Sequence, residues 1–244
     1  MLEAKVKADV LKNMVNSIAV LADEAKLNVS PDGINARCVD PAHVAMVNID
    51  LFSSAFEEYK AEECELGVDL EKLKDILRLA KGEDIVYVRH EEDKNRLIIT
   101  VGNLTRRMML VDTSGMSDPN VPSLDFEAKV VLNMNDLQQI IKAAENVSDN
   151  ITFVCTPEGF EAVSKGETDT VDLKLPKELL NVHECKDKVS SMYPLEYLLN
   201  MIKAIKSDFI TLHLSTNYPL KLEFDIGDGA GHGEYLLAPR IEEH

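Results

Sequence analysis

Tryptophan is absent from this chain of 244 residues, and aromatic residues together make up only 5% of it. Long apolar runs are missing as well, since no stretch approaches the roughly 18 residues that a membrane-spanning helix needs. The first residues carry charge at Glu3 and Lys5, where a secretory signal peptide would be apolar. We therefore expect a cytoplasmic protein, or a nuclear one if its source is a eukaryote.

Cysteine is scarce and scattered. The four cysteines are Cys38, Cys64, Cys155 and Cys185, and none of them forms a C-x-x-C pair of the kind that binds zinc. We interpret them as reduced structural thiols, and we predict neither a metal site nor a cofactor.

Basic residues are outnumbered by acidic residues. Lys and Arg total 26 against 43 Asp and Glu, which gives a formal net charge of −17. A surface of that charge repels nucleic acid as a whole. Any contact with DNA must then come from a local basic face, or from a topology that does not depend on affinity. The remaining composition, 45% hydrophobic and 28% charged, is typical of a folded protein long enough for two domains.

The two halves of the chain resemble each other. The tetrapeptide EAKV at residues 3–6 recurs at 127–130, which is 124 residues later (127 − 3). Two further pairs of similar segments follow in the same order, 30–34 with 156–160 and 84–86 with 208–210. Ordered matches across half the chain indicate an internal duplication.

Apolar residues recur at helical spacing in four segments, two in each half. These segments are 11–22, 70–80, 137–144 and 195–205. Strand-like stretches lie between them, among them 44–49, 85–88, 96–101 and 209–214. The pattern predicts an α+β fold with two similar domains, each with two helices packed on antiparallel β-sheet.

A turn-rich segment occupies the midpoint of the chain. Residues 113–125 contain Gly115, Pro119 and Pro122, which favour an irregular connection. We predict an N-terminal domain at 1–112, an interdomain connecting loop at 113–125 and a C-terminal domain at 126–244. A loop of about a dozen residues is long for a passive connection and is often functional.

Several motifs resemble those of the proliferating cell nuclear antigen family, in particular its archaeal members. They are DGINARCVDPAHV at 32–44, GVDL at 67–70, NYPL at 217–220 and YLLAPRIEE at 235–243. The resemblance covers essentially the whole chain in order. It implies the DNA clamp fold and a sliding clamp, or processivity factor, that is not an enzyme.

The family resemblance also implies an assembly and partners. Three protomers are expected to close head to tail into a ring of six domains, with the helices lining a hole that encircles double-stranded DNA without regard to sequence. A clamp loader would place the ring on DNA. DNA polymerase, flap endonuclease and DNA ligase would then dock through short peptide motifs.

Basic residues on the predicted helices are the candidates for facing DNA. Lys74, Arg78 and Lys81 fall at i, i+4 and i+7, on a face away from the apolar stripe. Taken alone, such residues are ordinary solvated helix charges. The full set of candidates is Lys12, Lys74, Arg78, Lys81, Lys142, Lys203 and Lys206.

The family resemblance places a peptide-docking groove beside the connecting loop. The expected lining is Val39, His43, Val44 and Met46 on one wall, Val121 and Phe126 on the linker side, and Pro219, Leu236, Ala238, Pro239 and Ile241 on the C-terminal side. Composition alone would make most of these apolar residues core residues. Apolar and aromatic anchors of a partner peptide would fill such a groove.

Ring closure in this family pairs an edge strand of one domain with an edge strand of the neighbouring protomer. The matching segments here are 106–111 and 168–174. Their charges are opposite in sign, which suits a heterologous, closing contact. The candidate interface residues are Arg106, Arg107 and Met109 on one side and Asp169, Val171 and Asp172 on the other.

Two other interpretations remain open. The chain could be one subunit of a heterotrimeric clamp, which would use the same strands. Alternatively, Asp32, Asp40 and His43 could bind a metal ion in a metal-dependent hydrolase. The glycine-rich segment 227–233 lacks the Lys-Ser/Thr ending of a phosphate-binding loop, so we predict a flexible hairpin there.

Overall fold

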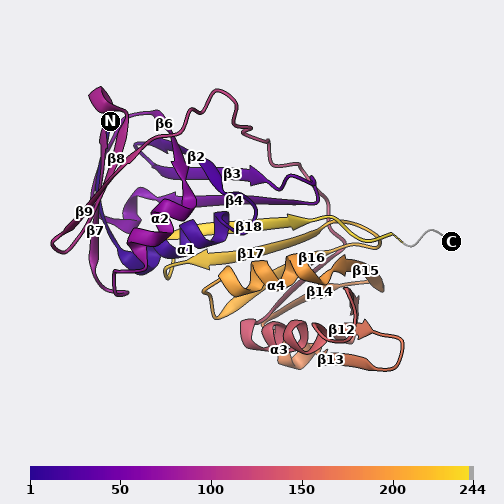
Figure 1. The fold of residues 1–244 in the computed structure, drawn as a ribbon. Coiled ribbons are helices and arrows are strands. Elements are labelled where there is room, and N and C mark those ends of the chain that lie inside the picture. The colour runs from indigo at the N-terminus through magenta and orange to yellow at the C-terminus, as the bar shows by residue number, and fades with distance from the viewer. Residues whose placement is uncertain (242–244) are drawn as a thin grey trace. The chain divides into compact units, whose positions relative to one another are not determined.

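The computed structural model describes residues 1–241, which fold into two compact units. The first unit comprises residues 1–121 together with 225–233. The second comprises 122–224 and the segment from 234 onward. Figure 1 shows both units along the chain and labels many of their elements.

The first unit contains two antiparallel sheets and a pair of helices. One sheet has the strand order β5-β1-β7-β8-β9, and the other includes the order β4-β3-β2-β6. The helices pack against each other and contact strands of both sheets. The elements are β1 (Leu2–Lys7), α1 (Ala8–Ile18), β2 (Glu24–Ser30), β3 (Gly33–Val39), β4 (Ala45–Phe52), β5 (Phe56–Ala61), β6 (Cys64–Asp69), α2 (Leu70–Leu77), β7 (Ile85–Glu91), β8 (Arg96–Val101) and β9 (Leu104–Met109).

The second unit repeats this plan. One sheet has the order β13-β12-β11-β15, a second includes β14-β10-β16-β17-β18, and α3 packs against α4. The elements are β10 (Ala128–Asn133), α3 (Met134–Ala144), β11 (Asn150–Thr156), β12 (Gly159–Lys165), β13 (Thr170–Pro176), β14 (Val182–Cys185), β15 (Val189–Pro194), α4 (Leu195–Ala204), β16 (Phe209–Leu214), β17 (Leu220–Ile226) and β18 (Gly231–Leu237). The end of β17 and the start of β18 fall within residues 225–233, which belong to the first unit. The predicted α+β class, with two helices on antiparallel sheet in each half, is confirmed.

The apolar stripes predicted from the sequence form the cores. Leu11, Met14 and Ile18 of α1 are buried, as are Leu137 and Ile141 of α3. Between the helices and the sheets these side chains are removed from water, which is the main favourable term in folding. None of the helices among residues 1–241 combines the length and the apolar content needed to cross a membrane.

The internal duplication is visible in a repeated hydrogen bond at the start of each long helix. The backbone N–H of Ala8 donates to the carbonyl of Asp84, and the N–H of Met134 donates to the carbonyl of Asp208, both at 2.8 Å. The helix starts are therefore 126 residues apart (134 − 8), whereas their acceptors are 124 apart (208 − 84). The EAKV match, taken at an offset of 124, is thus two residues out of structural register.

Candidate DNA-facing, docking and assembly surfaces

The basic residues of α2 are partly neutralised by acidic neighbours one turn away. Lys74 Nζ lies 2.6 Å from Glu71 Oε1, and Arg78 Nη1 lies 3.1 Å from Asp75 Oδ1. The Lys74 ammonium group lowers the pKa of Glu71, mainly through their hydrogen bond. Exposed pairs of this kind add little stability, but each one reduces the positive charge that the helix presents.

Two other candidates in the first unit differ from the sequence prediction. Lys81 does not extend the helical series, because α2 ends at Leu77 and Lys81 lies in the turn beyond it. Its backbone N–H donates to Asp84 Oδ2 at 2.7 Å and closes that turn. Lys12 is half-buried, and its ammonium group donates to the carbonyl of Ala80 at 2.6 Å, so it ties α1 to the end of α2.

The second unit carries basic residues without such partners. Lys142 and Lys203 lie in the last turns of α3 and α4, and Lys206 follows the end of α4. All three are exposed, and within residues 1–241 no carboxylate forms an ion pair with any of them. Positive charge at a helix C-terminus also complements the helix dipole. These lysines therefore present more uncompensated charge than their counterparts on α2.

The connecting segment is fastened to the first unit by a single carboxylate. Asp118 Oδ1 lies 2.8 Å from Arg37 Nε, while Asp118 Oδ2 accepts a hydrogen bond from Asn28 at 3.1 Å and lies 3.7 Å from Lys26 Nζ. Burial, together with the Asp118 charge, raises the pKa of the Cys38 thiol to about 11. The three partners lie on β2 and β3, so Asp118 holds the loop across these strands. Sequence reasoning did not single out this cluster.

The segment is also pinned where it leaves β9. The backbone N–H of Val111 donates to the carbonyl of Gly67 at 2.8 Å, forming an isolated antiparallel bridge. A Cβ atom on Gly67 would lie 2.2 Å from the Val111 oxygen, so this approach requires glycine. The segment from Val111 to Asp118 is thus fixed on the first unit at two points.

The loop after β3 is organised by a buried carboxylate. Asp40 is only 5% exposed, and its side chain accepts hydrogen bonds from the N–H groups of Ala42, Val44 and Ala45 at 3.1, 2.7 and 2.7 Å. His43 is exposed at the tip of the loop, with a left-handed φ of 56°. Asp40 therefore has a structural role, since a carboxylate with several N–H donors is satisfied without a metal.

This geometry counts against the metal-dependent hydrolase. Two groups of potential metal ligands occur within residues 1–241, and neither contains Asp32, Asp40 or His43. The loop instead presents Val44, which is half-exposed, beside the half-exposed Val39 of β3. Met46 is only 8% exposed and belongs to the core more than to a surface.

Two groove candidates of the second unit, Phe126 and Pro219, lie in or next to an aromatic cluster. The Phe126 ring lies 5.5 Å from the His213 ring and 5.7 Å from the Tyr218 ring, next to the half-exposed Pro219. The contact with His213 is tilted and the contact with Tyr218 is edge-to-face, and together they hold Phe126 in place as the chain enters the unit.

The C-terminal segment lies against β15. The backbone N–H of Arg240 donates to the carbonyl of Met192 at 2.7 Å, and this bridge holds the half-exposed Ala238 and Pro239 in place. Leu236 is buried at 8% exposure, whereas Ile241 is 70% exposed. In the first unit, Val121 is 36% exposed. Val121 and Ile241 are thus apolar side chains available to a partner.

Each unit leaves one of the proposed interface strands open. Among the described residues, β9 pairs only with β8, and β13 pairs only with β12. Arg107 and Met109 on β9 are exposed, as is Asp172 on β13. Unpaired edges of this kind are templates for pairing with another chain.

Two interface candidates also make local contacts within the chain. Arg106 Nη1 donates to the carbonyl of Lys72 at 2.8 Å, so its side chain turns back toward α2. Asp169 precedes the first residue of β13, and its carbonyl accepts a hydrogen bond from the N–H of Gly166 at 2.9 Å. Val171 is half-buried on β13.

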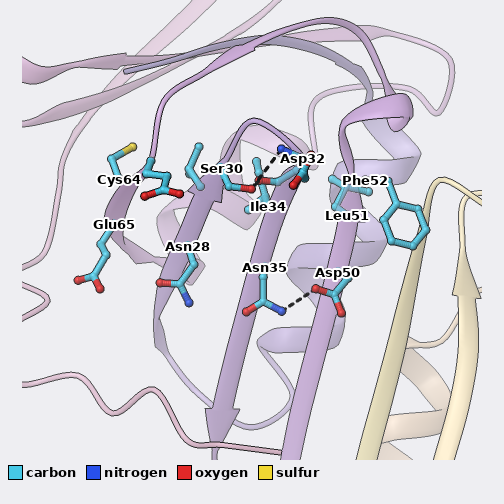
Figure 2. Close-up of a pocket in the computed structure, with 13 residues that line it drawn as sticks. Asn28, Ser30, Asp32, Ile34, Asn35, Asp50, Leu51, Phe52, Cys64 and Glu65 are labelled. Atoms are coloured by element: carbon cyan, nitrogen blue, oxygen red, sulfur yellow. Dashed lines mark hydrogen bonds between the residues drawn. The ribbon is translucent and has the colours of Figure 1, made fainter.

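A hollow of about 670 Å³ with both polar and apolar side chains opens over β2, β3, β4 and β6 in the first unit (Figure 2). Its polar side chains largely satisfy one another: Asn35 Nδ2 donates to Asp50 Oδ1 at 2.7 Å, and the N–H of Asp32 donates to Ser30 Oγ at 3.2 Å. Phe52, at the end of β4, is 44% exposed beside it. These contacts form no nucleophile and base pair.

Comparison with known proteins covers the full chain. Residues 1–118 match the N-terminal domain and residues 120–240 the C-terminal domain of proliferating cell nuclear antigen. Proteins named DNA polymerase sliding clamp from Methanosarcina mazei and Thermoplasma volcanium are 41% and 34% identical, over 99% and 96% of each chain.

Solved structures are also similar over nearly the whole chain. The structure of the C-terminal region of FEN-1 bound to A. fulgidus PCNA matches with a TM-score of 0.95 and 32% identity over 100% of both chains. PCNA from Thermococcus kodakaraensis matches with a TM-score of 0.90 and 28% identity, over 98% of this chain and 100% of that one. On both sequence and structure, the chain belongs to the proliferating cell nuclear antigen family of DNA sliding clamps.

Proposed function

We propose that three copies of this chain close into a ring around duplex DNA and serve as the processivity factor of a cytoplasmic DNA polymerase. The observation that carries the proposal is the pair of open edge strands, β9 in one unit and β13 in the other. A contact between two different edges is heterologous, and a heterologous contact whose rotation closes generates a ring. Residues 1–112 and 126–244 are then the two domains of each protomer, and 113–125 is the connecting loop.

Charge at these edges suits such a contact. Arg107 on β9 is exposed and basic, while Asp172 on β13 is exposed and acidic. Pairing the strands of neighbouring protomers would satisfy the backbone groups of both edges and place opposite charges near each other.

Retention on DNA is topological in this proposal. A chain with a net charge of −17 cannot hold DNA tightly by electrostatic affinity, even with lysines on α3 and α4. Threading removes that requirement, because a closed ring leaves DNA only by opening or by sliding off an end. The basic residues then serve to keep DNA centred and the ring mobile.

Partner enzymes dock on the same protomer in this proposal. The A. fulgidus relative is bound to the C-terminal region of FEN-1. By extension, peptide tails of a flap endonuclease, a DNA polymerase and a DNA ligase would bind the loop of Val44, the exposed Val121 and the C-terminal segment of Pro239. A clamp loader with ATP would open and close the ring.

Release from circular and linear DNA distinguishes threading from affinity. A binder that makes about 6–10 phosphate contacts loses roughly 10³–10⁵ in affinity between about 50 and 200 mM salt. After loading onto nicked circular DNA, the protein should instead survive a high-salt wash and be released when the circle is cut. Equal loss from circles and linear DNA in salt would overturn the encircling mechanism.

A further inference from the structure

Three potential metal ligands converge in the second unit. Cys155 lies on β11, while His183 and Cys185 lie on β14. Cys155 Sγ is 3.7 Å from His183 Nε2, and the ligand atoms of all three side chains lie within 4.8 Å of one another. Cys155 is fully buried, and the other two are half-buried.

The fold brings these residues together across two sheets. Cys185 ends β14, where it pairs with Ala128 of β10. The chain then turns through 186–188 into β15, and Val189 pairs with Cys155 in the other sheet. The cluster therefore sits at the corner where the chain passes from one sheet of the unit to the other.

The chemical types of the three ligand atoms indicate which metal ion the cluster would bind. Two sulfurs and one imidazole nitrogen suit zinc, whereas magnesium and calcium prefer oxygen. Zn–S bonds of about 2.3 Å and Zn–N bonds of about 2.0–2.1 Å in a tetrahedral site place sulfur and nitrogen roughly 3.6 Å apart. The separation of 3.7 Å between Cys155 and His183 is close to that value.

We propose that Cys155, His183 and Cys185 bind one zinc ion, with water in the fourth position. On binding, two S–H bonds break, two Zn–S bonds form, and both thiol protons pass to the buffer. His183 stays neutral: Nε2 now lies 2.8 Å from the carbonyl of Thr156 and donates to it, so its proton moves to Nδ1 when Nε2 binds zinc. The hydrogen bonds from His183 to Thr156 and from Cys185 to Asp187 are thus exchanged for three bonds between protein and metal.

Zinc can reach the site from the Cys185 side. A hollow of about 1060 Å³ borders Cys185 and the turn at 186–188. The Cys185 thiol donates to the carbonyl of Asp187 at 3.1 Å, a weak interaction that a metal displaces easily. Cys155 faces the interior, so it binds the ion only after zinc has passed Cys185.

A zinc ion here would act as a cross-link. It would tie β14, an edge strand with β10 as its partner, to β11 in the other sheet. The chain between Cys155 and Cys185 contains β12 and β13, so this segment would be closed into a loop. Because zinc would bind only the folded unit, it would raise the free energy of unfolding by RT ln(1 + c/Kd), which grows with the free zinc concentration c.

Zinc titration of the full chain, held reduced by a non-thiol reductant, tests the proposal. We expect one zinc per chain by elemental analysis after dialysis, and tetrahedral, thiolate-bound spectra when Co²⁺ replaces zinc. The melting temperature should rise with zinc. Zinc should also slow alkylation of Cys185 by a maleimide and leave alkylation of Cys64, equally half-buried but in the first unit, unchanged.

Variants assign the ligands. Cys185→Ser and His183→Gln should each weaken zinc binding by at least about 100-fold, the upper end of what losing an outer-shell partner costs. Both positions are partly exposed, so these variants are better suited than Cys155→Ser to retain the fold. Cys64→Ser is the matched control and should bind zinc normally. Absence of retained zinc in the wild-type chain, or equal retention by Cys185→Ser and Cys64→Ser, would overturn the proposal.

Discussion

Arg37 and Asp118 form an ion pair, with 2.8 Å between Arg37 Nε and Asp118 Oδ1, that fastens the connecting segment to β3. Both side chains are largely buried, at 27% and 24% exposure, so the pair is better shielded from solvent than the exposed pairs on α2. Its carboxylate also accepts a hydrogen bond from Asn28. The position of Val121, three residues further on, depends on this attachment.

Replacing that carboxylate by a neutral amide should loosen the segment. In Asp118→Asn we expect the free energy of unfolding to fall by about 1.5–3 kcal/mol, the usual contribution of a hydrogen bond to a charged group. Proteolysis within 113–125 should become several-fold faster. Asp125→Asn, an exposed change in the same segment, is the control. Equal cleavage rates in the two variants would show that Asp118 does not hold the loop.

A charge in the docking groove should separate peptide binding from folding. Val44 is half-exposed, and its backbone is held by Asp40, so Val44→Glu should fold normally. Loss of an apolar contact at the centre of a docking surface costs roughly 2 kcal/mol or more. Calorimetry with a flap endonuclease tail peptide should show that loss, while Ala42→Glu, on the exposed part of the same loop, binds normally. Unchanged affinity in Val44→Glu would place the groove elsewhere.

The open edge strands β9 and β13 predict a trimer whose stability depends on charges at the interface. Light scattering should give about three times the chain mass of 27.2 kDa. Arg107→Glu should shift the protein toward monomer because it would face Asp172 across the interface, and mixing it with Asp172→Arg should restore part of the assembly. Arg89→Glu, exposed on the central strand β7, should leave the trimer intact. A stable monomer of the unmodified chain would instead favour a subunit of a heterotrimer.

Basic residues of the second unit should contribute more to polymerase stimulation than Lys74 and Arg78 of the α2 region. Lys74 and Arg78 already have carboxylate partners at 2.6 and 3.1 Å, whereas Lys142 and Lys203 present uncompensated charge. We expect the double reversal of Lys142 and Lys203 to Glu to reduce polymerase stimulation more strongly than the double reversal of Lys74 and Arg78. Primer extension on circular DNA onto which the protein has been loaded measures this stimulation. The opposite order would mean that the ion pairs of α2 open on DNA.

Local patterns predicted the elements well, because helical spacing of apolar residues depends only on near neighbours. The end of α2 was misjudged: the apolar Ala80 suggested a further turn, but the chain turns at Lys81 and Asp84 instead. The EAKV match was also misplaced, by two residues relative to the structural register. Strand side chains alternate with a period of two, so a shift of two residues preserves the inward and outward pattern.

Clusters of residues that lie far apart in the sequence could not be predicted from local patterns. Arg37 and Asp118 are far apart in the sequence, and neither lies in a pattern that points to the other. The sequence did not point to the proposed zinc site although His183 and Cys185 are two residues apart, because Cys155 reaches them only through the pairing of β11 with β15. Asp40 was considered as a metal ligand since the sequence does not show its three N–H donors.

Acid should remove a specific stabilising contact in the second unit. Glu223 Oε2 accepts a hydrogen bond from His213 Nε2 at 2.7 Å, and Glu223 Oε1 lies 2.6 Å from Lys221 Nζ. The hydrogen bond from His213, followed by that from Lys221, lowers the pKa of Glu223 from 4.5 to about 2. A carboxylate whose pKa is lower in the folded state contributes stability that is fully present above its unfolded pKa.

That contribution should be lost as the pH falls from about 4.5 toward 2, because the unfolded chain takes up the proton first. Urea unfolding should therefore show Glu223→Gln to be less stable than the unmodified chain near pH 7, with the difference shrinking steadily as the pH is lowered through this window. Glu158→Gln, an exposed change in the same unit, should give no such convergence. If the gap between Glu223→Gln and the unmodified chain stayed constant down to pH 2, the contact with His213 would not be a charge-dependent one.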